Sequence, residues 1–288
     1  MIPPQFDYIS PQTLPEALTL LGNNPDAKVL AGGHSLIPML KFRLATPTLL
    51  VDIGRLAGLS SIREEDGWLK IGALTVESAI DKSSLIHAKY PLLSDAARMI
   101  ADPIVRNKAT VGGNLAHADP ANDHPAVMLA FGAEIVVTGV AGPKTIPITE
   151  FFVGPFTPAI NHAELLTEIR IPAHKPGDGG SYIKIERKVG DYATAGVAVQ
   201  LHVTADGTCD KIGLALTNLG LTPIHCTAAM AALTGTKLTD ADVKHAVALA
   251  ADVAEPQDDY RGTEEYKRSL VRTITTRAIK AALVRAKA

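Results

Sequence analysis

Apolar and polar positions in the first part of the chain alternate between a helical pattern and a strand pattern. Thr13 opens a capping-box signature, and the residues after it predict a short helix over 13–21. Apolar runs of strand length follow at residues 28–31 and 49–53. We expect these segments to form a small βαβ-like unit over residues 1–55.

The middle of the chain mixes both patterns. Alternation on either side of the dipeptide Asp66-Gly67 predicts a hairpin over residues 61–75, because a type I′ turn needs positive φ at both central residues. Further helices are expected at residues 75–81 and 91–101, and further strands at 133–138 and 165–171. We therefore predict a second subdomain of mixed α/β structure over residues 56–176.

A cluster of glycine and proline at residues 172–180 marks the next boundary, because such a composition does not sustain regular structure. Beyond it, strands are expected at 182–187, 195–203 and 209–217. A last helix should begin after a Thr263 cap and carry one apolar stripe, which we interpret as core packing. These elements predict a smaller α+β domain over residues 177–288.

Composition narrows the function. The chain has 288 residues, 47% of them apolar, with 28 basic against 30 acidic side chains, so no charge excess favours nucleic acid. The N-terminus lacks the pattern of a secretory signal, and no apolar run approaches the roughly 20 residues that span a bilayer. We expect a cytoplasmic protein without a membrane span.

The sequence contains two cysteines, Cys209 and Cys226, which are too few to ligate an ordinary iron-sulfur cluster. Free cysteine is usually a small buried hydrophobe, and we expect both side chains to be buried. Any cluster that works with this chain must therefore lie on another chain.

Two glycine pairs are the candidate chemistry. They stand in the segments AGGHS, from Ala31 to Ser35, and TVGGN, from Thr110 to Asn114. Consecutive glycines allow positive φ and close backbone approach, so that successive N–H groups can hold an anion. Each pair alone is more simply a tight turn, but two such loops together suit a diphosphate. Neither GxGxxG nor GxxxxGK followed by Ser or Thr occurs, which argues against a Rossmann or P-loop site.

Three longer stretches contain these motifs: AGGHSLIPMLKFR, ADPIVRNKATVGGNLAHADPANDHPA and ERKVGDYATAGVAV. In this order they resemble the FAD-binding subunits of the molybdenum hydroxylases, most of all the medium subunits of aerobic carbon monoxide dehydrogenases. The resemblance implies an α+β fold, in which a vanillyl-alcohol-oxidase-type FAD-binding domain of two α/β subdomains precedes a smaller C-terminal α+β domain.

The resemblance also implies roles for individual residues. Both glycine loops would bind the FAD diphosphate, Asp123 would accept hydrogen bonds from the middle of the cofactor, and Tyr192 would lie against the isoalloxazine. Leu166 and Lys184 would be secondary contacts, and Val111 stands where isoleucine is common in the family. The implied FAD-binding set is Ala31, Gly32, Gly33, His34, Ser35, Thr110, Val111, Gly112, Gly113, Asn114, Asp123, Leu166, Lys184 and Tyr192.

Two other chemistries are weighed against this interpretation. The histidines and aspartates of HADPANDH, residues 117–124, are disfavoured as a metal site because Asp123 matches a flavin residue and prolines mark a loop. The GHS of residues 33–35 resembles a nucleophile elbow, but Ile37 stands at the closing glycine position. We expect no catalytic side chain and no metal on this chain.

By the same resemblance, a molybdenum cofactor on a large subunit and two [2Fe-2S] clusters on a small subunit would pass electrons to this FAD. The complex would be a dimer of heterotrimers, with peripheral membrane association possible through its electron acceptor. Carbon monoxide is the first candidate substrate, and N-heterocycles, aldehydes and aromatic acyl thioesters remain open. The alternatives are a stand-alone flavin oxidase or dehydrogenase and a non-catalytic nucleotide-binding subunit.

Overall fold

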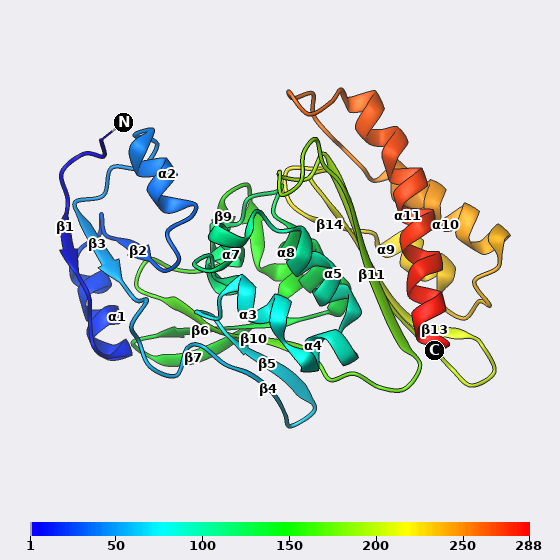
Figure 1. The fold of residues 1–288 in the computed structure, drawn as a ribbon, viewed down its shortest axis with the longest axis horizontal. Helices are drawn as coiled ribbons and strands as arrows, with labels where there is room; N and C mark the ends of the chain where they lie inside the picture. The colour runs from blue at the N-terminus through cyan, green and yellow to red at the C-terminus, as the bar shows by residue number, and fades with distance from the viewer. Residues whose placement is uncertain (1) are drawn as a thin grey trace.

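The computed structural model describes residues 2–288, and its first sheet is built from short strands near the N-terminus (Figure 1). This sheet is parallel, with the order β1-β3-β2. Its strands are β1 (Asp7–Ile9), β2 (Lys28–Leu30) and β3 (Leu49–Asp52), connected by helices α1 (Leu14–Asn23) and α2 (Leu36–Lys41). The predicted βαβ-like unit is confirmed. Strand β1 was not predicted, because all of its residues are exposed and carry no apolar pattern.

The second sheet is antiparallel and has the order β4-β5-β10-β6-β7. Its strands are β4 (Ile62–Glu65), β5 (Trp68–Gly72), β6 (Glu134–Gly139), β7 (Gly142–Pro147) and β10 (Leu165–Pro172). The β4–β5 hairpin turns at Asp66 and Gly67 with φ of 53° and 80°, as the sequence predicts. A small hairpin, β8 (Phe152–Gly154) with β9 (Thr157–Pro158), follows the short 3-10 helix η1 (Ile148–Glu150).

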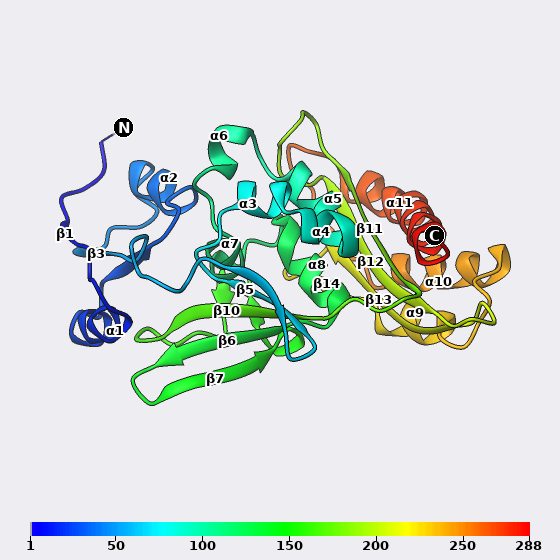
Figure 2. The same ribbon diagram turned by 60° about the horizontal axis from the view of Figure 1, so that its bottom comes forward.

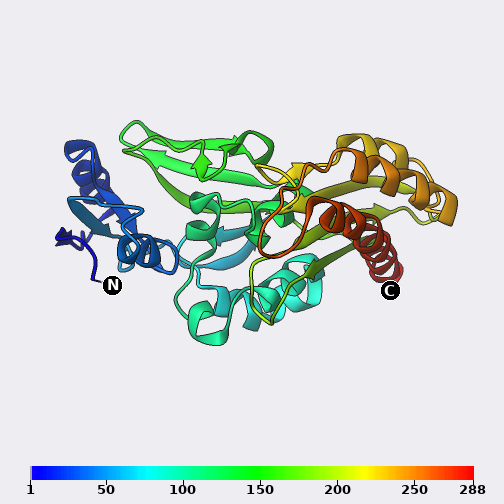
Figure 3. The ribbon, with the colours of Figure 1, turned by 90° about the horizontal axis from the view of Figure 1, so that it is seen from above.

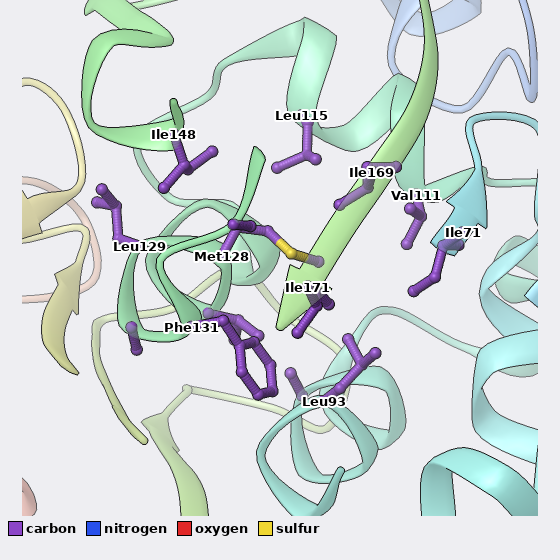
Figure 4. Close-up of a cluster of buried hydrophobic side chains, with 14 of the residues drawn as sticks. Ile71, Leu93, Val111, Leu115, Met128, Leu129, Phe131, Ile148, Ile169 and Ile171 are labelled. Carbon is purple, nitrogen blue, oxygen red and sulfur yellow. The ribbon is translucent and has the colours of Figure 1, made fainter. Parts of the chain in front are cut away.

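Helices pack on this second sheet, and Figure 2 shows α7 and α8 above its strands. The helices of this region are α3 (Glu77–Lys82), α4 (Ser84–Lys89), α5 (Pro91–Met99), α6 (Pro103–Arg106), α7 (Val111–His117) and α8 (Asp123–Phe131). Every residue of α8 is buried, so that this helix lies inside the core. Within the cluster of Figure 4, Met128 lies among isoleucines of β10 and leucines of the helices. Full burial of a side chain of this kind contributes about 1.5–3 kcal/mol.

The C-terminal sheet is antiparallel, with the order β11-β12-β13-β14. Its strands are β11 (Asp178–Ile185), β12 (Ala195–Val203), β13 (Cys209–Thr217) and β14 (Ile224–His225). Helices α9 (Thr227–Leu233) and α11 (Glu264–Ala286) pack on it, and α10 (Asp240–Asp252) packs against both helices, at the far end of the molecule from the N-terminal unit (Figure 3). Thr263 caps α11, and the predicted stripe of this helix is in the core.

Helices α5 and α8 also contact the C-terminal sheet, so that they lie between two sheets. A Cβ atom on Gly213 of β13 would stand 1.9 Å from the carbonyl oxygen of Ala130 in α8. On the opposite face, a Cβ atom on Gly179 of β11 would stand 2.2 Å from the carbonyl oxygen of Ala282 in α11. The prediction that residues up to 180 form a loop is therefore wrong at its end, since β11 begins at Asp178 and uses its glycines for close helix packing.

Candidate functional site

The first glycine motif is a loop between β2 and α2 that presents free backbone donors. Gly33 has φ of +79°, a conformation that glycine adopts without a Cβ penalty. Within residues 2–288, no acceptor takes a hydrogen bond from the N–H groups of Gly32, Gly33, His34 or Ser35. A row of unengaged N–H groups on an open loop is a ready anion site.

The second glycine motif is arranged differently, because Gly112 and Gly113 lie in the first turn of α7 and neither has positive φ. Thr110 caps this helix, its Oγ1 accepting the Gly113 N–H at 3.2 Å. The Gly112 N–H donates to the Ala73 carbonyl at 2.9 Å. The expectation that both pairs turn free N–H groups toward one anion is therefore wrong for the second pair, whose donors are used inside the protein.

The two motifs nevertheless meet. A Cβ atom on Gly32 would stand 2.2 Å from the Lys108 carbonyl oxygen, and one on Gly113 would stand 4.0 Å from the Cβ of Ala31. Between them lies a cavity of about 290 Å³. Of the predicted residues, this cavity is lined by Ala31, Gly32, Gly33, His34, Ser35, Thr110, Gly113 and Asn114.

Asn114 offers an unmatched polar group at this cavity. Its side-chain Oδ1 is buried and has no hydrogen-bond partner among residues 2–288. Buried polar groups are almost always paired, so an orphan here fits a site that a polar ligand completes. The unengaged loop donors and the glycine without a side chain suit the acceptor oxygens of a diphosphate, whereas Asn114 Oδ1 is itself an acceptor and suits a ligand hydroxyl or N–H group.

A second cavity of about 240 Å³ adjoins the first, and both are lined by Lys28, Ala31, Gly113 and Ala116. Its other walls are largely apolar and include Leu166, while Gly112 also faces it. Val111, in contrast, is fully buried in the core and lines neither cavity. The two spaces together can accept an extended ligand that is polar in its middle and apolar at one end.

Asp123 and Lys184 line neither cavity, and they bind each other. Asp123 Oδ2 accepts from Lys184 Nζ at 3.1 Å, and Asp123 Oδ1 accepts from the Tyr182 hydroxyl at 2.6 Å. Burial raises the pKa of Asp123, while the charge of Lys184 opposes that rise. Lys184 Nζ also donates to the carbonyls of Met99 at 2.7 Å and Asp191 at 3.0 Å. Sequence reasoning missed Tyr182, since nothing near it indicates a buried partner across 59 positions.

Tyr192 lies in the connection between β11 and β12 and is 42% exposed. The guanidinium of Arg261 stands 5.5 Å from its ring centre, and Arg261 Nη2 also binds Asp191 at 3.1 Å. Burial raises the pKa of Tyr192, and the charge of Asp119 adds to the rise. Tyr192 lines neither cavity. Arg261 was also missed, because no local pattern connects it with residue 192.

The two histidines of segment 117–124 have different surroundings and do not form one site. His117 lines the first cavity with its ring centre 5.2 Å from that of Phe156, and burial lowers its pKa. His124 is buried and hydrogen-bonded to Glu77 at 2.8 Å. Across the part of the chain that the structure describes, no three side chains of His, Cys, Asp or Glu gather as a metal site. Over the same residues, no helix is long and apolar enough to cross a membrane.

Comparison with known proteins decides the family. Residues 4–174 match the family model described as the FAD binding domain in molybdopterin dehydrogenase, and residues 180–282 match the CO dehydrogenase flavoprotein C-terminal domain. The chain belongs to this flavoprotein family. The predicted resemblance, the FAD-binding domain and the α+β fold class are thereby confirmed.

Relatives in this flavoprotein family match over the full length. The carbon monoxide dehydrogenase medium chain of Hydrogenophaga pseudoflava is 43% identical, with 99% of each chain covered. The glyceraldehyde dehydrogenase medium chain of Sulfolobus acidocaldarius is 37% identical, covering 97% of this chain and 99% of the relative. Among solved structures, carbon monoxide dehydrogenase from Hydrogenophaga pseudoflava superposes with a TM-score of 0.96 at 45% identity, with 99% of each chain covered. Quinoline 2-oxidoreductase from Pseudomonas putida 86 gives 0.93 at 30% identity, with 100% of each covered.

Proposed function

We propose that this chain is the FAD-carrying electron-transfer subunit of a multi-subunit molybdenum hydroxylase, in a complex like carbon monoxide dehydrogenase. The observation that carries the proposal is the row of unengaged N–H groups from Gly32 to Ser35, which faces Gly113 and Asn114 across one cavity. Such a row supports binding of the FAD diphosphate. Family membership supports the identity of the cofactor.

The rest of the cofactor follows from the diphosphate position. The adjoining cavity, with walls such as Val29, Leu74 and Leu166, is apolar enough for the adenosine half. The isoalloxazine would then lie toward Tyr192, beside the Asp123–Lys184 pair. Bound flavin supplies one-electron and two-electron chemistry, while the protein supplies binding, orientation and electrostatics. In this proposal the fourteen residues predicted from the family are the FAD site, with Val111 acting through the core.

Partner subunits complete the electron path. Cys209 and Cys226 are both buried, so this chain has no thiolates to offer a cluster. The proposal assigns two [2Fe-2S] clusters to a small subunit and the molybdenum cofactor to a large subunit. Assembly as a dimer of heterotrimers, a cytoplasmic location and peripheral membrane association stay predictions.

The substrate of the complex is proposed from the relatives. Carbon monoxide comes first, since two carbon monoxide dehydrogenase medium chains are 43% and 42% identical to this chain. Relatives named for nicotine 6-hydroxylase and caffeine dehydrogenase share 33% and 36% identity over 96% and 97% of this chain. Because such different substrates accompany one flavoprotein fold, substrate choice belongs to the molybdenum subunit.

The test is to isolate the native complex, record its visible spectrum and determine its subunit masses. Two further polypeptides should accompany this chain, with both flavin and iron-sulfur absorption. A single polypeptide that oxidises substrate with flavin absorption alone would favour a stand-alone flavin oxidase. A colourless chain that takes up no FAD would favour a non-catalytic nucleotide-binding subunit. Activity with carbon monoxide, aldehydes and N-heterocycles then distinguishes the substrates.

A further inference from the structure

Glu77 and His124 form a buried pair that the FAD site itself does not use. Both side chains are 0% exposed, and His124 Nε2 lies 2.8 Å from Glu77 Oε2. The remaining polar atoms of the pair, Glu77 Oε1 and His124 Nδ1, have no partner among residues 2–288. Burying two charged groups with half of their polar atoms unmatched is costly, and a purely apolar pair would often be more stable. The pair therefore calls for an explanation other than stability.

The backbone of Glu77 is hydrogen-bonded to the residue that precedes the second glycine motif. Its backbone N–H donates to the Ala109 carbonyl at 2.9 Å, and the neighbouring Val76 forms a β-bridge with Thr110. Thr110 is the residue that caps α7 and lines the first cavity. A displacement of Glu77 would therefore move the cap of the helix that carries Gly113 and Asn114.

His124 connects the pair to the C-terminal domain. It follows Asp123 in the first turn of α8, and Asp123 binds Lys184 of β11 at 3.1 Å. Lys184 donates in turn to the Asp191 carbonyl at 3.0 Å, directly before Tyr192. Contacts thus run without interruption from the α7 cap, through two adjacent buried ion pairs, to the loop of Tyr192 in the C-terminal domain.

We propose that Glu77 and His124 are positioning residues for FAD, which hold the α7 cap and the Tyr192 loop in a fixed relation without touching the cofactor. The inference rests on the proposed function, in which one FAD contacts both ends of this run. A ligand that contacts two preset ends binds without the cost of ordering them, so loosening the run weakens binding. A pair that served stability alone would leave the affinity of the folded protein for FAD unchanged.

The test is a double-mutant cycle on FAD affinity, measured by titrating FAD into the deflavinated complex and recording flavin fluorescence. Its arms are Glu77→Gln, Tyr192→Ala and the combination. Distant independent sites multiply their effects, with scatter of about twofold. We expect Glu77→Gln to weaken FAD binding about tenfold alone but much less in the Tyr192→Ala background, because that variant has already released one end.

Tyr90→Phe is the matched control. Tyr90 is also buried in the FAD-binding domain, and its hydroxyl donates to Glu64 at 2.6 Å, away from both cavities. This variant should lower the melting temperature while the FAD dissociation constant stays unchanged. If Glu77→Gln does not fold, His124→Gln enters the cycle in its place, with the same expectation.

The outcomes separate this inference from the proposed function. If the wild-type complex takes up no FAD, the proposed function is wrong and the inference is wrong with it. If wild type binds FAD but Glu77→Gln and His124→Gln lower only the melting temperature, the pair is structural and only the inference is wrong. Purely multiplicative effects of Glu77→Gln and Tyr192→Ala would also overturn it.

Discussion

Gly32 stands so close to Lys108 that a Cβ atom at residue 32 would lie 2.2 Å from the Lys108 carbonyl oxygen. Gly32 lies in the loop between β2 and α2, and Lys108 lies in the segment between α6 and α7. Their contact therefore joins the first glycine loop to the segment that leads into α7. Glycine is required here by close approach and not by φ, since Gly32 is not among the glycines with positive φ.

The first prediction concerns that contact. Gly32→Ala should push the loop away from residues 108–109 and open the first cavity, so that FAD content falls severalfold. A displacement of backbone by a new methyl group costs about 1–3 kcal/mol. Flavin absorbance per polypeptide and the melting temperature measure both effects. Gly22→Ala is the control, because its Cβ would meet Ala163 at an ordinary 3.9 Å and alanine favours the helix. Normal FAD content in Gly32→Ala would refute the proposed convergence.

A second prediction tests the anion site by charge alone. Ser35→Asp places a carboxylate among the free N–H groups of the loop, where it would repel a diphosphate and also occupy its donors. Ser35→Asn has nearly the same shape without the charge and serves as the control. We expect the aspartate variant to weaken FAD binding by about 2 kcal/mol, or thirtyfold, relative to asparagine. Equal FAD dissociation constants for the two variants would show that the diphosphate does not bind at this loop.

The third prediction is a pH dependence of stability. Burial lowers the pKa of His124, but the charge of Glu77 and its hydrogen bond outweigh burial and leave that pKa raised above its ordinary 6.5. A raised folded-state pKa contributes stability that is complete below the unfolded pKa and is lost as the pH rises through the folded value. The melting-temperature difference between wild type and His124→Gln should therefore be largest near pH 6 and shrink toward alkaline pH. A difference that grows with pH would contradict this sign.

A fourth prediction concerns the two thiols, whose expected burial is confirmed. Burial raises the pKa of Cys209 to about 11 and that of Cys226 to about 12. Because the thiolate is the nucleophile, neither should react with a disulfide reagent at pH 8 in the folded protein. Both should react at once after unfolding in guanidinium. Rapid labelling of the folded chain would show that one of the thiols is accessible.

The sequence predicted most elements of the fold, because their periodicity is local. It did not predict α7, since two glycines in seven residues lower helix propensity. Only the fold shows that Gly112 packs against Ala73 and that Gly113 faces Ala31. The convergence of the glycine motifs followed from residue types. The sequence did not predict that the N–H groups are free in the first motif and engaged in the second, because a local pattern does not reveal which N–H groups find acceptors.

The pairing of the buried polar groups could not be predicted from the sequence, for the same reason. Asp123 and Lys184 were predicted from the family as cofactor contacts, but their mutual ion pair crosses 61 positions and two domains. Glu77 belongs to no motif, and His124 was considered only as part of the disfavoured metal segment HADPANDH. Their pairing depends on how the first turns of α3 and α8 are brought together, which is a tertiary property.

The placement of α5 and α8 between two sheets has a consequence for how this molecule exchanges electrons. A hinge between its halves would have to pull apart one continuous apolar interior, and that is far more expensive than moving a surface loop. The Tyr192 loop and the α7 side of the site are therefore held by one shared core and should keep their relative positions while electrons arrive and leave.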